Sequence, residues 1–175
     1  HDLEVETRIG VRGPMGNSWP IDYLEGKNVV VVGGGFAFTT LRSLIVYMIH
    51  EDNRSRFGNI TVVYGARTPG LLIYKDELAA WEARDDINLH VTVDKGDESW
   101  KGREGFVPTV CKEVAPSSEN AVTVICGPPI MMYATERSPS SRHQRNTRLQ
   151  SSVSQCFSWT SSPVLCIDST PKCSF

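Results

Sequence analysis

The stretch Asn28-Val29-Val30-Val31-Val32-Gly33-Gly34-Gly35 runs four β-branched valines directly into three glycines. The following residues, Phe36 to His50, have the spacing of a helix. A buried strand, a glycine turn and a helix N-terminus form a cradle for a pyrophosphate, because glycine admits close approach and free N–H groups attract negative charge. A full Gly-x-Gly-x-x-Gly motif requires glycine at position 38, where this chain has Phe38. Taken alone, the stretch leaves a nucleotide site and a plain strand–helix turn both open.

The composition is that of one globular domain. The chain has 175 residues, 40% hydrophobic and 22% charged, with a formal net charge of −2. Nothing at this level indicates nucleic acid, and no apolar run approaches the roughly 20 residues that span a bilayer. The N-terminus is acidic, unlike a secretory signal, and the lack of an initiating Met suggests that sequence before His1 is missing. Five scattered cysteines without a Cys-x-x-Cys pair favour the reducing cytoplasm.

Strand-like and helix-like segments alternate along the chain. We expect a half-exposed strand over 3–12 and buried strands over 28–32, 59–64, 87–93 and 121–126. We expect helices over 36–50, 76–83, 109–114 and 130–136, the first capped by Thr39 or Thr40, and polar loops over 51–58 and 94–104. This alternation predicts an α/β fold with a doubly wound parallel sheet.

Ligands of such sheets lie beyond the carboxyl ends of the strands, where the strand order reverses. Three strand ends should therefore converge on one site: Gly33–Phe36, Gly65–Arg67 and Cys126–Met131. These segments are the candidate binding loops.

The pattern stops at Arg137. Residues 1–136 carry 13 basic and 19 acidic groups, whereas residues 137–175 carry five basic groups, one acid and 11 serines. Val164-Leu165-Cys166-Ile167 is the one strand-like run in this tail. We therefore expect 137–175 to be either a disordered tail or a segment translated out of frame.

Four phrases occur together in the order and spacing of one known superfamily. They are Val11-Arg12-Gly13-Pro14-Met15-Gly16-Asn17-Ser18-Trp19-Pro20, Val31-Val32-Gly33-Gly34-Gly35, Tyr64-Gly65-Ala66-Arg67-Thr68-Pro69 and Cys126-Gly127-Pro128-Pro129-Ile130-Met131-Met132. Over about residues 8–136 they resemble the ferredoxin–NADP reductase-like superfamily. The pattern is most like that of its electron-transfer subunits, such as the gamma subunit of cytoplasmic sulfhydrogenases and the dihydroorotate dehydrogenase electron-transfer subunit. One phrase alone is a weak signal, whereas four in order are a strong one.

The resemblance implies the cofactors and the role of each segment. In that superfamily an N-terminal barrel binds FAD, a C-terminal domain binds NAD(H) or NADP(H), and a hydride passes from nicotinamide to flavin before electrons leave singly. The flavin junction would involve Gly13, Pro14, Gly16 and Asn17. Cofactor-binding residues would be Gly33, Gly34, Gly35, Phe36, Thr39, Thr40, Gly65, Ala66, Arg67, Cys126, Gly127, Pro128, Pro129 and Met131. Cys126 would lie beside the nicotinamide as an orienting catalytic group rather than a nucleophile.

Three features depart from the family pattern. The usual Gly-x-Gly-x-x-Pro is replaced by Gly35-Phe36-Ala37-Phe38-Thr39-Thr40, in which Ala37 narrows the backbone approach and a Thr40 hydroxyl remains available to a phosphate. The flavin-binding Arg-x-Tyr-Ser motif is absent. Some relatives carry a four-cysteine [2Fe–2S] segment, which the spacing of Cys156, Cys166 and Cys173 does not fit.

Several residues have an ordinary structural interpretation beside the functional one. Arg67 is either a solvated surface side chain or a partner for a 2′-phosphate, so the choice between NAD and NADP stays open. Cys126 is either a small core residue or the nicotinamide neighbour. His50 and His90 have no partners at metal-ligand spacing, and no metal site is expected. Cys111 is expected to be structural.

We therefore divide the chain into a remnant of the flavin barrel and junction (1–20), a nicotinamide-binding domain (21–136) and the tail (137–175). The expected function is that of an NAD(P)H:flavin oxidoreductase subunit passing electrons to a hydrogenase, a heterodisulfide-reductase-like complex or a dehydrogenase. This piece alone should show little turnover. The alternatives are a nucleotide-binding module without redox chemistry and a damaged gene product.

Overall fold

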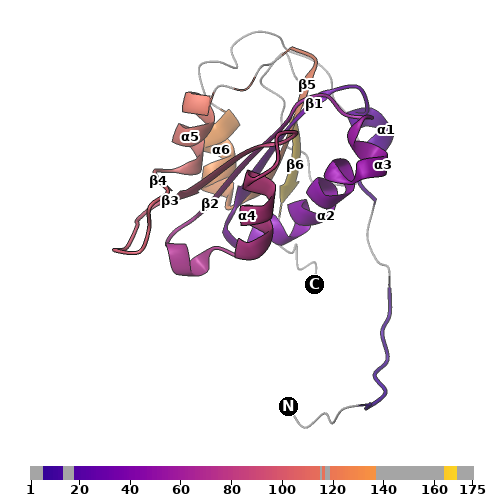
Figure 1. Ribbon diagram of the computed structural model, residues 1–175, viewed down its shortest axis with the longest axis horizontal. Helices are drawn as coiled ribbons and strands as arrows, with labels where there is room; N and C mark the ends of the chain where they lie inside the picture. The colour runs from indigo at the N-terminus through magenta and orange to yellow at the C-terminus, as the bar shows by residue number, and fades with distance from the viewer. Residues whose placement is uncertain (1–5, 14–17, 115, 117–118, 137–163, 169–175) are drawn as a thin grey trace, which may run out of the picture.

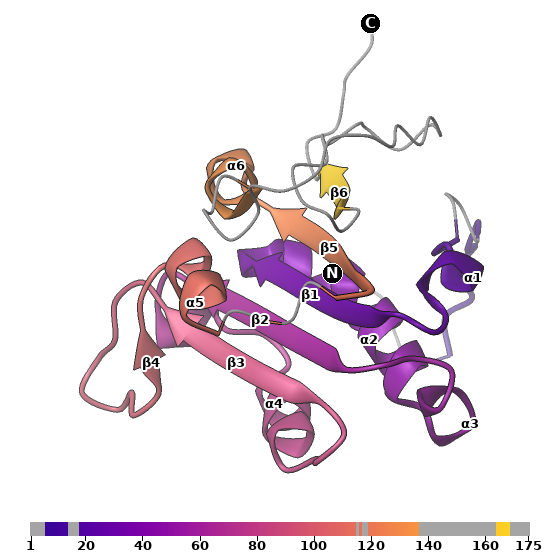
Figure 2. The same cartoon turned by 90° about the horizontal axis from the view of Figure 1, so that it is seen from above.

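A parallel sheet forms the centre of the molecule. The computed structural model describes residues 6–13, 18–114, 116, 119–136 and 164–168, the last segment by its backbone alone. The strands are β1 (Asn28–Gly34), β2 (Ile60–Ala66), β3 (Asn88–Val93), β4 (Arg103–Glu104), β5 (Ala121–Gly127) and β6 (Val164–Asp168). Their order is β4-β3-β2-β1-β5-β6, and every pairing is parallel (Figure 2). The doubly wound parallel sheet predicted from the sequence is thus confirmed.

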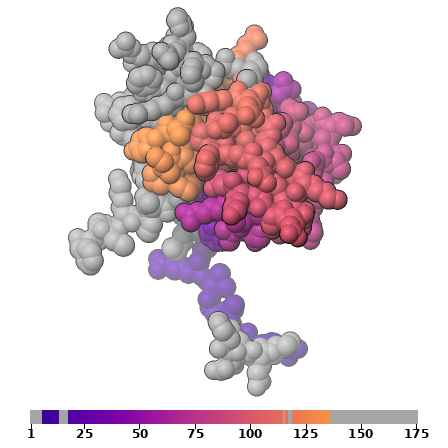
Figure 3. All heavy atoms as spheres, turned by 90° about the vertical axis from the view of Figure 1, so that its left-hand side faces the viewer, coloured from indigo at the N-terminus to yellow at the C-terminus, as the bar shows by residue number. Residues whose placement is uncertain are grey.

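Helices cover both faces of this sheet. They are α1 (Ile21–Leu24), α2 (Phe38–Ile49), α3 (Glu51–Arg54), α4 (Lys75–Glu82), α5 (Val107–Val114) and α6 (Pro129–Glu136), with 3₁₀ turns η1 (Gly35–Ala37) and η2 (Pro69–Leu71). α2 and α4 lie on one face, and α5 and α6 lie on the other (Figures 1 and 2). Figure 3 views the molecule from the left-hand side of Figure 1, where α6 (orange) lies beside the α5 region (salmon).

The valine strand divides its side chains between the two layers. Val29 and Val31 join the large core under α2 and α4, whereas Val30 and Val32 join a smaller cluster under α5 and α6. Because successive residues of a strand point to opposite faces, a strand covered on both sides must be apolar at every position. The continuous valine run is therefore explained by the sandwiched position of β1.

Phe38 fills the position where a full motif would have its third glycine. The ring is fully buried and stacks on Tyr64, with ring centroids 3.9 Å apart and an interplanar angle of 16°. A Cβ on Gly33 would lie 2.6 Å from Phe38 Cδ2, so the missing side chain of Gly33 makes room for the ring. Core packing thus explains the departure from the motif, because Phe38 on α2 packs against the backbone of Gly33 on β1.

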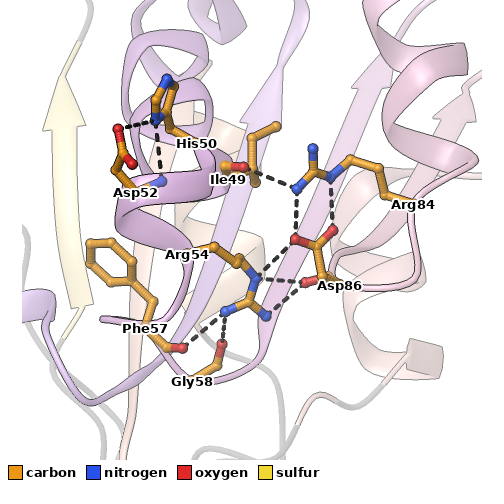
Figure 4. Close-up of polar contacts among 8 residues, drawn as sticks. All are labelled: Ile49, His50, Asp52, Arg54, Phe57, Gly58, Arg84 and Asp86. Carbon is orange, nitrogen blue, oxygen red and sulfur yellow. Dashed lines mark hydrogen bonds and ion pairs between the residues drawn. The ribbon is translucent and has the colours of Figure 1, made fainter.

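A polar network closes the end of the molecule opposite the glycine turn (Figure 4). Arg54 donates to the backbone carbonyls of Phe57, Gly58 and Asp86, and Arg84 donates to both carboxylate oxygens of Asp86. Hydrogen bonds from Arg84 lower the pKa of Asp86, and the charges of Arg84 and Arg54 act in the same direction. The network joins α3 to the segment that enters β3.

We expect Asp86→Asn to lower the free energy of unfolding at pH 7 by about 1 kcal/mol, a modest value because the pair is partly exposed and screened by solvent. The folded-state pKa of Asp86 lies below its unfolded value, so its contribution is present above the unfolded pKa and is lost as pH falls through the folded one. Urea unfolding between pH 7 and pH 2 should show a shallower acid dependence for the variant. Parallel curves for the variant and the parent chain would contradict this assignment.

Three of the segments were predicted wrongly in the described part of the chain. Residues 6–13 form no strand and are exposed, because an alternating segment becomes a strand only beside a partner, and none pairs with it here. The expected loop 51–58 begins with α3, whose first turn is capped by the His50 ring accepting from the Asp52 N–H group. The expected loop 94–104 ends in the two-residue strand β4, which is too short to show a period.

Within the tail, Val164–Asp168 forms β6 and pairs in parallel with β5. The one strand-like run in that segment therefore provides the last strand of the sheet. The two interpretations of the tail, a disordered segment or one translated out of frame, stay predictions. The remainder of 137–175 lies outside the described residues, and the boundaries at 20 and 136 stay predictions. None of the helices described here is both long and apolar enough to cross a membrane.

Candidate functional site

The carboxyl ends of β1 and β5 meet at the point where the strand order reverses. β1 pairs with β2 on one side and with β5 on the other, and Gly33 lies in register with Cys126. The chain leaves β1 toward α2 on one face and leaves β5 toward α6 on the other (Figure 2). This divergence opens the edge of the sheet at which doubly wound folds bind their ligands.

The turn after β1 is shaped for close approach of an anion. Gly35 has φ +56°, a left-handed conformation that glycine adopts without strain, and its missing side chain faces open space. No side chain caps η1 or α2. The N–H groups of this first turn therefore remain for an outside acceptor, in the field of the helix dipole. The donors and the lack of a Cβ at Gly35 fit a pyrophosphate.

The predicted helix caps Thr39 and Thr40 do not cap α2, which begins at Phe38 with Ala37 as its N-cap. Thr39 is half-buried and Thr40 is exposed. Phe36 projects its ring into solvent at the same turn, with 80% of its surface exposed. Phe36 and Thr40 are therefore accessible to a ligand at this edge, and Thr39 partly so.

Met131 covers the two neighbouring strand ends. A Cβ on Gly34 would lie 2.6 Å from Met131 Sδ, and a Cβ on Gly127 would lie 2.5 Å from Met131 Cε. Pro129 begins α6, and the Met131 N–H group donates to the Pro128 carbonyl. The segment predicted from the sequence thus meets the glycine turn, and a flexible thioether fills the space that two glycines leave.

The second strand end contributes an exposed cation. Arg67 follows β2 directly, is exposed, and makes no side-chain hydrogen bond or ion pair within the described residues. Ala66 is buried in the large core. Gly65 faces α5, where a Cβ would lie 2.3 Å from Val107 Cγ2 and 3.0 Å from Thr92 Cγ2. Packing therefore explains Gly65 and Ala66, and Arg67 is the side chain of this segment that a ligand can reach.

Gly65→Ala should destabilise the domain by about 1–3 kcal/mol, since both opposing side chains are β-branched and have little freedom to move away. Thermal and urea unfolding would measure the loss. Gly70→Ala is the matched control, because its added Cβ meets nothing within 4 Å. Equal stability of the two variants would show that α5 does not pack against β2 in this way.

The two described cysteine side chains are buried or nearly so. Cys126 is 1% exposed and belongs to the large core under α2. Burial raises the pKa of the Cys111 thiol to about 12, so it is protonated at neutral pH. The expectation that Cys111 is structural agrees with this environment, and an orienting role for Cys126 stays a prediction.

Two contacts near the site could not be predicted from the sequence. Arg42 on α2 forms a two-pronged ion pair with Glu77 on α4, and its guanidinium lies 5.0 Å from the centre of the Tyr74 ring. Tyr74 itself has φ 56°. The Arg42–Glu77 ion pair joins α2 to α4. Its two residues are 35 positions apart in the sequence, so no local pattern predicts their contact.

The remaining predicted site residues lie apart from this edge or outside the described chain. Gly13 is exposed in the N-terminal segment, and Pro14, Gly16 and Asn17 lie outside the described residues. Among the residues that are described, no group of three or more His, Cys, Asp or Glu side chains is placed to hold a metal ion.

Comparison with known proteins identifies the family. Residues 31–137 match the oxidoreductase NAD-binding domain. The chain belongs to this family. The match begins within the valine strand and ends one residue after α6, so it covers the glycine turn and both partner strand ends.

The chain is 32% identical over 134 residues to the sulfhydrogenase 1 gamma subunit of Pyrococcus furiosus, covering 75% of this chain and 45% of that protein. It is 32% identical over 141 residues to NADH-cytochrome b5 reductase 2 of Scheffersomyces stipitis, covering 77% of this chain and 45% of that protein. It therefore spans less than half the length of these curated relatives.

Solved structures agree on the fold. The cytochrome b5 reductase domain of Ulva prolifera nitrate reductase matches with a TM-score of 0.54 and 27% identity, over 62% of this chain and 42% of that one. A ferredoxin NADP⁺ reductase from Neisseria gonorrhoeae, with bound FAD and NADP, matches with a TM-score of 0.55 and 21% identity, over 69% and 51%. The predicted superfamily is thereby confirmed.

Proposed function

We propose that this chain is the nicotinamide-binding half of a flavin-dependent NAD(P)H oxidoreductase that supplies electrons to a partner redox protein. The observation that carries the proposal is the uncapped glycine turn at the strand-order reversal, where Gly35 is left-handed and open. The family match and the relatives that are named as reductases or as a sulfhydrogenase subunit support it.

Each part of the edge then has a task. The backbone of Gly34–Ala37 holds the pyrophosphate, and the Gly127–Met131 segment limits the space on the nicotinamide side. Arg67 provides a cation near the ribose of NAD(H) or the 2′-phosphate of NADP(H). The bound nicotinamide would supply a hydride for transfer to FAD, which a separate flavin-binding domain would hold. The chain itself supplies position and charge, since the redox chemistry belongs to the cofactors.

The partner and the location belong to the same proposal. A hydrogenase, a heterodisulfide-reductase-like complex or a dehydrogenase would receive the electrons, in the cytoplasm. The named relatives contain both a sulfhydrogenase subunit and cytochrome reductases, so the protein that accepts electrons differs within the family.

Isothermal titration of the full chain with NADH and with NADPH tests the binding step. We expect saturable one-to-one binding of at least one of them, with adenosine as a control that lacks the pyrophosphate. Failure of both to bind would contradict the proposal. In a longer protein that includes the flavin-binding domain, NAD(P)H should bleach the flavin absorbance, whereas a module without redox chemistry would bind the nucleotide and leave the flavin bands unchanged.

A further inference from the structure

A second concave region lies at the opposite end of the strands from the glycine turn. It is a cavity of about 460 Å³ on the face covered by α5 and α6. Its floor is formed by β1, β2 and β3, including Val30, Thr61 and His90, and its walls include Arg103, Val114 and Pro116. The volume lies within the range of small-molecule sites, about 300–1,000 Å³.

The cavity exists because α5 is shorter than the strands that it covers. α5 ends at Val114, so none of the described helices lies above the first halves of β2 and β3 on this face. The chain places Thr61 and His90 there, whereas Val63, farther along β2, packs under α5 and α6. Polar residues on a strand are normal where solvent covers the strand. Thr61 and His90 therefore do not by themselves indicate a binding site.

The burial of Thr61 provides further evidence. The residue is 7% exposed, and its hydroxyl makes no hydrogen bond within the described residues. A buried hydroxyl without a partner costs about 1–3 kcal/mol, so such groups usually meet a water molecule or a ligand. The imidazole of His90 also lacks a hydrogen bond among these residues, and desolvation together with the charge of Arg103 lowers its pKa.

Arg103 is the charged residue of the cavity lining, and its guanidinium is ion-paired with Glu113. One guanidinium nitrogen, Nη1, donates to Glu113 at 3.0 Å, and Arg103 makes no second side-chain hydrogen bond in the described residues. The remaining donors can hold a carboxylate by two parallel hydrogen bonds. Val30 on the floor and Val114 and Pro116 on the wall add apolar surface to the lining. The lining therefore combines one cation, neutral polar groups and an apolar surface.

We propose that this cavity binds a small monocarboxylate of the N-acyl amino acid class. Its carboxylate pairs with Arg103, its amide contacts Thr61 and His90, and its side chain packs on Val30, Val114 and Pro116. The site is separate from the nucleotide edge and does not depend on the proposed oxidoreductase activity.

Amide NMR shifts of the full chain during titration with N-acetyl-L-leucine test the proposal. We expect saturable shifts around Thr61 and His90, and none with N-acetyl-L-leucinamide, which lacks the charge. Arg103→Gln should weaken binding at least about tenfold and Thr61→Val about fivefold, as expected for a charged and a neutral hydrogen bond. Lys101→Gln, which removes an exposed cation from the same loop, should leave the affinity unchanged.

Unfolding curves of Arg103→Gln and Thr61→Val establish that each variant still folds. Glu113→Gln is a further test, because it releases Arg103 from its ion pair and should therefore not weaken binding of the probe. The proposal would be overturned by the absence of shifts up to the solubility of the probe, by equal binding of the amide, or by unchanged affinity in Arg103→Gln. Tighter binding of N-acetyl-Gly-Gly-Leu than of the single residue would also overturn it, since the ligand would then be a peptide end.

Discussion

Phe38→Ala should lower the free energy of unfolding by about 3–5 kcal/mol, the range for removal of a fully buried aromatic ring. The ring is stacked on Tyr64 and lies over the bare backbone of Gly33, so its loss leaves a cavity between α2 and β1 that neither neighbour can fill. Urea unfolding followed by far-UV circular dichroism measures the change. It also tests whether the chain folds cooperatively, which a damaged gene product would not do.

Phe36→Ala is the matched control for this experiment. It removes the same ring two positions earlier, from a side chain that is 80% exposed. We expect a change of less than about 0.5 kcal/mol, the usual range for surface substitutions. Similar losses for the two variants would mean that Phe38 is not the packing element between the glycine turn and Tyr64.

Gly35→Ala should weaken dinucleotide binding at least about tenfold, equivalent to 1.4 kcal/mol. The added methyl group occupies the open side of the turn, where the backbone would approach the pyrophosphate. It also imposes a left-handed conformation on alanine, which costs about 1–2 kcal/mol of stability. The two effects must be separated, because a destabilised turn would also bind weakly.

Gly26→Ala separates them. Gly26 has φ +69°, close to the +56° of Gly35, and a Cβ at either position would meet nothing within 4 Å. It precedes β1, at the other end of the sheet. Both variants should lose similar stability by thermal unfolding, and Gly35→Ala alone should lose affinity in calorimetric titration. Equal dinucleotide affinities of the two variants would show that the glycine turn is not part of the binding site.

Much of the fold was predictable because its signals are local. A strand buried on both faces is apolar at every position, and the Val29–Val32 run and the strands near 60 and 122 have this pattern. The alternation with helical segments then favours a parallel sheet, and its reversal point predicts where the binding edge lies. Residues 6–13 show the limit, since their alternating pattern specifies a strand only when a neighbour is present.

The sequence predicted that the ends of β1, β2 and β5 meet at one edge, but it did not show why each residue there has its type. Gly65 was chosen as a nucleotide contact, yet Val107 on α5, which follows it by 42 positions, explains why no side chain fits there. Phe38 was interpreted as a defect in the glycine motif, whereas its partner Tyr64 shows it to be a core residue. Such explanations depend on contacts between distant segments, which local spacing does not contain.

The proposed function requires that a nicotinamide dinucleotide binds at the carboxyl ends of β1 and β5. Titration of the isotope-labelled full chain with NADH and NADPH, followed by amide NMR, locates the ligand directly. We expect the largest shifts at Gly34–Ala37 and Gly127–Met131, with smaller ones at Arg67 and none around Thr61 and His90. Saturable binding that moves only amides away from the glycine turn, or no shift with either dinucleotide, would contradict the central claim.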